Sequence, residues 1–179
     1  MKSRINVLTM CAVVAIGSML STSSAFADRT TRFSRDNAAG GQTSGVNRFR
    51  SGANGGAAAQ RRVVRTDGNG NAMVNRGGGF VAPNGAKGVR GSSTVYGADG
   101  SVQHKSGMAT SGSRGSMTTS GSATKSADGT ITQNRNTNVT NSATGNSYQG
   151  STSYNSDTGL TRSGTCYDAG GSEIPCPTR

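Results

Sequence analysis

Arginines are the side chains with the clearest chemical potential in this sequence, and they concentrate toward its front. The segment 28–90 carries 11 Lys and Arg against 3 Asp, a net charge of +8, whereas the segment 91–179 carries 6 against 5 acids, a net of +1. A guanidinium matches phosphate and carboxylate through a planar fork of donors. We therefore expect an anionic partner to bind at Arg29, Arg32, Arg35, Arg48, Arg50, Arg61, Arg62 and Arg65.

Two cysteines near the C-terminus have a spacing that favours a disulfide. Cys166 and Cys176 flank the turn-like segment YDAGGSEIP. In an oxidising compartment such a pair closes a terminal hairpin or loop. A metal is the alternative, but two cysteines and the distant His104 do not complete a tetrahedral zinc site. We expect no metal and no cofactor.

The residues that could support catalysis are few. His104 is the single histidine of the chain, and no base can be assigned to a nucleophile. The segment DGNGN at 67–71 begins like a calcium loop, but the closing ligand at its twelfth position would be Gly78 instead of a glutamate. The sequence therefore predicts a non-catalytic protein.

A recurring turn indicates the elements that position these side chains. Asp99, Asp128 and Asp157 follow one another at intervals of 29 residues, and softer glycine turns lie between them. A turn therefore arrives every 13 to 16 residues from Asn84 onward. This rhythm is typical of repeated β-hairpins.

Between these turns the sequence alternates, as β-strands do. The alternation predicts strands at 101–110, 116–125, 130–140, 147–154 and 160–167. One parity is weakly apolar, with residues such as Val102, Ile131 and Leu160, and the other is almost purely Ser, Thr, Asn and Gln. If the strands pair in order, the polar parity forms one broad hydroxyl and amide surface.

The fold that this pattern predicts is mainly β, a repetitive antiparallel β-meander or β-solenoid-like sheet with a disordered N-terminal segment. We divide the chain into a signal peptide (1–27), a basic Gly/Arg-rich disordered segment (28–65) and a β-repeat region with a C-terminal disulfide loop (66–179). The middle segment is expected to be disordered because it holds neither a helical nor a strand period.

The N-terminus reads as a Sec-type export signal. Lys2 and Arg4 precede an apolar run that ends near Leu20, and small residues at Ala25 and Ala27 suit cleavage after Ala27. The apolar run is too short to span a bilayer comfortably. We expect a periplasmic, secreted or cell-surface protein with no integral membrane span after cleavage.

Composition limits what such a sheet can bury. The chain has 28 Gly and no Trp, so a thick core is excluded. We expect the sheet to stack on its own front half, on a second copy or on a surface.

The function we expect is that of an exported bacterial structural or surface-interaction protein, with anionic polysaccharide, lipopolysaccharide or extracellular DNA as partner. Two alternatives are a self-assembling fibre or biofilm-matrix subunit, which would be a homo-oligomer, and a flat Thr/Ser sheet that binds ice or polysaccharide.

Overall fold

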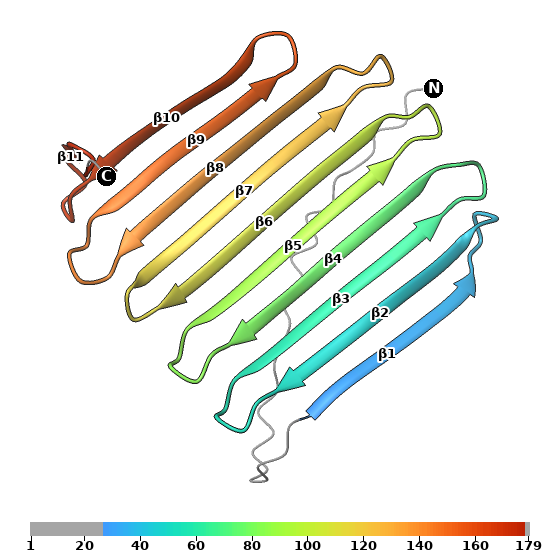
Figure 1. Ribbon diagram of the computed structural model, residues 1–179, viewed down its shortest axis with the longest axis horizontal. Coiled ribbons are helices and arrows are strands. Elements are labelled where there is room, and N and C mark those ends of the chain that lie inside the picture. The colour runs from blue at the N-terminus through green and yellow to red at the C-terminus, as the bar shows by residue number, and fades with distance from the viewer. Residues whose placement is uncertain (1–26, 178–179) are drawn as a thin grey trace.

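A computed structural model describes residues 27–177, which form one antiparallel sheet of 11 strands in sequence order (Figure 1). The strands are β1 (Ala27–Asp36), β2 (Gln42–Ser51), β3 (Ala57–Thr66), β4 (Ala72–Val81), β5 (Lys87–Tyr96), β6 (Val102–Gly112), β7 (Gly115–Lys125), β8 (Ile131–Asn141), β9 (Ser147–Asn155), β10 (Gly159–Tyr167) and β11 (Glu173–Ile174). The predicted antiparallel meander is confirmed, and the strand order is not that of a solenoid. Within the described range we find no helix that could cross a bilayer.

Most of the turns share one construction, which explains the spacing seen in the sequence. In the first turn Gly40 N–H donates to the Asn37 carbonyl (3.2 Å), and Asn37 N–H donates to the Gly41 carbonyl (2.9 Å). Gly40 has a φ of 76°, a left-handed conformation that glycine adopts without steric cost. This is a three-residue hairpin loop with a glycine bulge. Glycines with positive φ recur in the later turns, at Gly55, Gly70, Gly85, Gly100, Gly129, Gly145, Gly159 and Gly171.

The prediction that residues 28–65 are disordered is wrong. β1, β2 and nearly all of β3 lie in that segment, and they pair in continuous register with each other and with β4. The boundary that we placed between 65 and 66 falls inside β3. The physical reason is that a strand in a single-layer sheet needs ladder hydrogen bonds and turns rather than a regular apolar face, so strands rich in arginine and polar residues also pair. Residues 1–26 of the predicted signal peptide lie outside the described residues.

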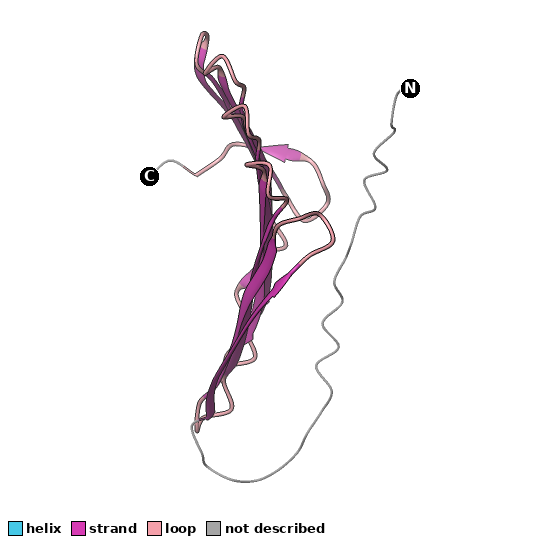
Figure 2. Ribbon diagram, turned by 90° about the vertical axis from the view of Figure 1, so that its right-hand side faces the viewer, coloured by secondary structure: helices cyan, strands magenta, loops and turns pink. Residues whose placement is uncertain are grey.

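The sheet is a single layer without a packed core. Seen edge-on, the strands stack in one thin, gently twisted layer (Figure 2). Among the described residues only Thr43, Gly45, Val63, Gly88 and Cys166 are buried, and no large side chain is fully enclosed. The expectation that the sheet stacks on its own front half is therefore wrong, because β1–β5 extend the same layer.

Aromatic rings cover several of the glycines inside strands. Phe33 lies over Gly45, Phe80 over Gly88, and Tyr148 over Gly164 on the neighbouring strand. A methyl group added at Gly88 would come within 2.6 Å of the Phe80 ring, so the missing side chain makes room for the aromatic neighbour. Such pairs protect strand backbone that glycine would otherwise leave bare.

Candidate anion-binding surface

The register sorts the side chains onto two faces with different chemistry. Face A holds the even-numbered residues of β1–β6, β9 and β10 and the odd-numbered residues of β7 and β8, and face B holds the others. The predicted weakly apolar parity lies on face A throughout β6–β10. The predicted hydroxyl and amide parity lies on face B. This prediction of the strand faces is therefore confirmed.

A row of arginines crosses face A near the middle of the strands. Five consecutive strands, β1 to β5, contribute one exposed arginine each: Arg32, Arg48, Arg62, Arg76 and Arg90. We call these five residues the arginine row. Arg62 is directly opposite Arg76, and the other neighbours in the row are one diagonal step apart. With strands about 4.8 Å apart, the row spans roughly 19 Å. Arg135 on β8 and Arg162 on β10 prolong it across face A.

The positive charge of the row is not neutralised within the sheet. In residues 27–177 the one ion pair joins Arg50 to Asp28 at 3.2 Å, at the margin of face A and outside the row. Like charges directly opposite one another on neighbouring strands are destabilising, and Arg62 and Arg76 are such a pair. An anion that bridges them would remove this repulsion. Binding of an external polyanion would therefore relieve the electrostatic repulsion within the row.

Four of the eight side-chain carboxylates are held away from the row, in turns at one end of the sheet. The turns that contain Asp67, Asp99, Asp128 and Asp157 each follow an odd-numbered strand, so all four lie at the same end. Hydrogen bonds within the turns lower the pKa of three of them. The donors are the Asn71 side chain for Asp67, the Ser101 hydroxyl for Asp99 and the Thr130 backbone N–H for Asp128. These acids are thus committed to shaping turns, far from the row.

The eight arginines predicted to bind an anion are divided between the two faces. Face A receives four of them, and face B receives the other four: Arg29, Arg35, Arg61 and Arg65. Arg50 lies on face A but belongs to the ion pair. The register therefore places the eight residues on two opposite surfaces, and anion binding by each of them stays a prediction.

Sequence reasoning missed the continuation of the row at Arg76 and Arg90. Both lie beyond the segment that we interpreted as disordered. The signal that could have found them is the interval between the arginines, which is 16, 14, 14 and 14 residues along the row. That interval is close to one strand plus one turn, so it brings successive arginines to neighbouring places on one face.

The surface around the row forms a shallow trough of about 630 Å³ on face A. Four arginines of the row border it, from Arg48 to Arg90, and Arg135 lies at its far end. Between them the floor is made of small or polar residues, including Ser92, Ser106 and Gly121. A flexible chain with repeated anionic groups could lie along this trough across the strands.

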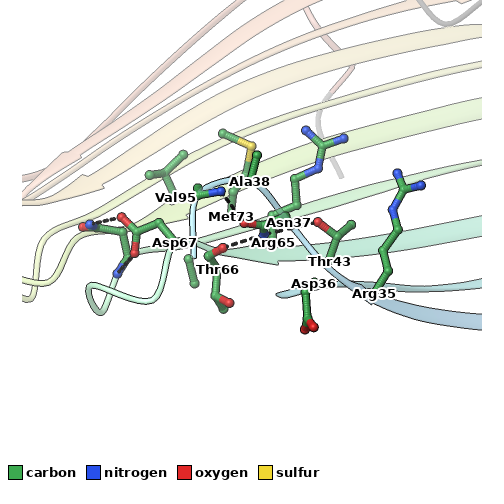
Figure 3. A pocket seen from close by; sticks show the side chains of 13 residues that line it. Arg35, Asp36, Asn37, Ala38, Thr43, Arg65, Thr66, Asp67, Met73 and Val95 are labelled. Carbon is green, nitrogen blue, oxygen red and sulfur yellow. Dashed lines mark hydrogen bonds between the residues drawn. The ribbon is translucent and has the colours of Figure 1, made fainter. Parts of the chain in front are cut away.

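A second hollow, of about 700 Å³, lies where the β1–β2 and β3–β4 turns meet. Figure 3 shows Arg35 and Arg65 on one side of the sheet and Asp36 pointing to the other. Asn37 Nδ2 ties the two turns together by donating to the Thr66 carbonyl at 2.8 Å. The two arginines flank Thr43, which is buried. The two arginines of this hollow could bind one small anion, but they do not form a continuous row of positive charge across the sheet.

Face B of β7–β9 is uncharged and entirely polar. Every side chain there is Ser, Thr, Asn or Gln, and the array continues through Thr161, Ser163 and Thr165 of β10. Some of these groups hydrogen-bond to each other across strands, as Ser151 does with Ser163 at 2.7 Å. The flat surface that the ice- or polysaccharide-binding alternative requires is present as a geometric feature.

The histidine and the two cysteines singled out in the sequence make contacts that connect parts of the sheet. His104 Nδ1 lies 2.8 Å from Thr94 Oγ1 on the neighbouring strand, a cross-strand hydrogen bond on face A. Cys166 and Cys176 form a disulfide, as predicted. The disulfide holds the segment after β10 so that β11 can pair with the last two residues of that strand.

Together, fold and surface define a class: a single-layer antiparallel sheet with a row of arginines across face A and a hydroxyl- and amide-rich array on face B of β7–β10. Comparison with protein-family models, with curated proteins and with solved structures finds no match for this chain.

Proposed function

We propose that this chain is an exported, non-catalytic structural protein that binds an anionic polymer across face A. The arginine row is the observation that carries the proposal. It presents one exposed guanidinium on each of five neighbouring strands, without a carboxylate partner in the described residues. The chemistry that fits is a chain of repeated phosphates or carboxylates, as in extracellular DNA, acidic polysaccharide or lipopolysaccharide.

A polymer suits the row better than a single ion does. Each strand adds a binding group at a step of about 4.8 Å, so a ligand with several linked anions can engage several arginines at once. Linked contacts reinforce one another through their high effective concentration. The disulfide between Cys166 and Cys176 supports a location in an oxidising compartment, where such polymers occur.

The experiment is a binding assay of the purified protein against duplex DNA, a polyuronate and polyphosphate, with uncharged dextran as the control polymer. We expect binding to all three polyanions, weakened by salt, and no binding to dextran. Equal retention on dextran, or no binding to any polyanion, would contradict the proposal. Comparing the three polyanions separates phosphate from carboxylate preference.

Export is tested separately, by fractionating cells that express the full chain and measuring the mass of the processed product. The proposal expects a product that begins at Asp28, outside the cytoplasm. A full-length product confined to the cytoplasm would remove the export part of the proposal and leave the binding part to stand or fall on the assay above.

A further inference from the structure

The two edges of the sheet have backbone hydrogen-bonding groups without partners in the described residues. β1 is the terminal strand on one side, and no strand within residues 27–177 pairs with its outer edge. On the other side, β11 pairs only with Cys166 and Tyr167 of β10. The outer edge of β10 therefore stays open from Gly159 to Thr165. Open strand edges are templates for pairing with another chain.

The hydrogen-bond pattern identifies which groups face outward. Asn37 N–H donates to the Gly41 carbonyl, and inward and outward directions alternate along an antiparallel strand. The outward residues of β1 are therefore the even-numbered ones, Asp28 to Asp36. Asp168 N–H donates to the Ser172 carbonyl on the β11 side. The same alternation leaves Leu160, Arg162 and Gly164 with free outward groups on β10.

The two edges match in direction and in face. Ten long strands is an even number, so β1 and β10 run in opposite directions within one sheet. A second copy placed beside the first by translation thus brings its β1 antiparallel to β10. The outward residues of both edges have their side chains on face A. Pairing them therefore keeps face A of both copies on the same side and continues the meander.

We propose that copies of this chain associate head to tail, with β1 of one copy pairing with β10 of the next. In the register that this favours, Ser34 lies opposite Arg162, with Asp36 opposite Leu160 and Arg32 opposite Gly164. This register keeps three hydrogen-bonded pairs and sets no two like charges directly opposite each other. Shifting the register by two residues so that Arg32 lies opposite Arg162 creates a like-charge pair, which is disfavoured. Shifting it by two residues in the opposite direction sets Asp36 opposite Arg162, but only two hydrogen-bonded pairs then remain between the strands.

β11 sets the length of the contact. It already occupies the positions beside Cys166 and Tyr167, and the disulfide anchors it there. The first residues of the incoming β1 must therefore leave the plane before they reach it. Because the contact joins two different edges, each addition exposes a fresh β1 or β10, and assembly is open-ended. Such an assembly would place the arginine rows of successive copies on the same side of one continuous sheet.

A proline substitution on the outer edge tests the proposal. A proline at Ser34 removes an outward N–H in the middle of the proposed contact without breaking a bond between β1 and β2. We expect the wild-type protein to form species larger than a dimer that grow with concentration in sedimentation velocity. The Ser34→Pro variant should stay monomeric, and the control Ser34→Ala should assemble as the wild type does.

Charge variants test the register and do not depend on proline being tolerated. Ser34→Arg places an arginine opposite Arg162 and should weaken assembly about two- to fivefold, and adding Arg162→Asp in the same chain should restore it. A wild-type protein that stays monomeric, one that stops at a dimer, or a proline variant that keeps its β-sheet circular dichroism and assembles normally would overturn the proposal. Polyanion binding is measured on the same variants. If it persists when assembly is lost, the proposed function is separate from this inference.

Discussion

Removing arginines from face A should lower the salt dependence of polyanion binding, whereas removing as many from face B should not. The face A variant is Arg48→Gln, Arg62→Gln and Arg76→Gln. The matched control, Arg29→Gln, Arg61→Gln and Arg65→Gln, changes the net charge by the same amount on neighbouring strands. The two variants therefore differ in the face that they neutralise and not in total charge.

The magnitude follows from the number of arginines that contact the polymer. With all five arginines of the row on duplex DNA, the logarithm of the affinity should fall with the logarithm of salt at a slope of about −4.5, and with two left at about −1.8. An approximately fourfold rise in salt then weakens wild-type binding about 500-fold and face A variant binding only about 12-fold. Fluorescence anisotropy with labelled DNA at several salt concentrations measures both slopes. Equal slopes for the two variants would refute the assignment to face A, because net charge alone would then explain binding.

Three further predictions concern the sheet itself. Gly100→Ala should lower the free energy of unfolding by about 1–2 kcal/mol, because Gly100 has a φ of 82°. Gly100→Asn should lower it less, since asparagine tolerates this conformation, and thermal unfolding of the two variants measures the difference. The pKa of Asp67 is lowered from 3.8 in the folded protein, so its stabilising contribution is present above that value and is lost as pH falls below it. An NMR titration should show a midpoint below 3.8 that Asn71→Ala raises, and an unchanged midpoint would contradict the assignment. Cys176→Ser should lower the free energy of unfolding by about 2–3 kcal/mol, and rapid alkylation of both thiols without reduction would show that the disulfide is absent in solution.

Much of the fold could be predicted because turn chemistry and side-chain parity are local. The glycines at the left-handed turn positions mark every hairpin from Gly85 onward, and strict alternation assigned the faces of β6–β10 correctly. The sequence did not predict β1–β3, because we recognised a strand only where apolar and polar residues alternate. Arginines interrupt any apolar period in these strands. The turn glycines still mark them, because Gly40 and Gly55 repeat the same interval of 15 residues that separates Gly70, Gly85 and Gly100.

The site was predicted only in part because its composition was visible but its geometry was not. The arginine-rich segment is evident in the sequence, yet a shift of one residue moves a side chain to the opposite face. Arg61 and Arg62 show the effect, since neighbours in the chain lie on different faces of β3. Only the pairing register separates the residues of the row from those of face B.

The most direct test of the account is to observe the arginine side chains while a polyanion binds. In a protein labelled with ¹⁵N-arginine, we expect the Nε–H signals of Arg32, Arg48, Arg62, Arg76 and Arg90 to shift together on addition of polyphosphate. The signals of Arg29, Arg61 and Arg65 should stay in place. Shifts of similar size on both faces, or shifts confined to face B, would contradict the claim that a continuous arginine row on one face of a single-layer sheet is the binding surface.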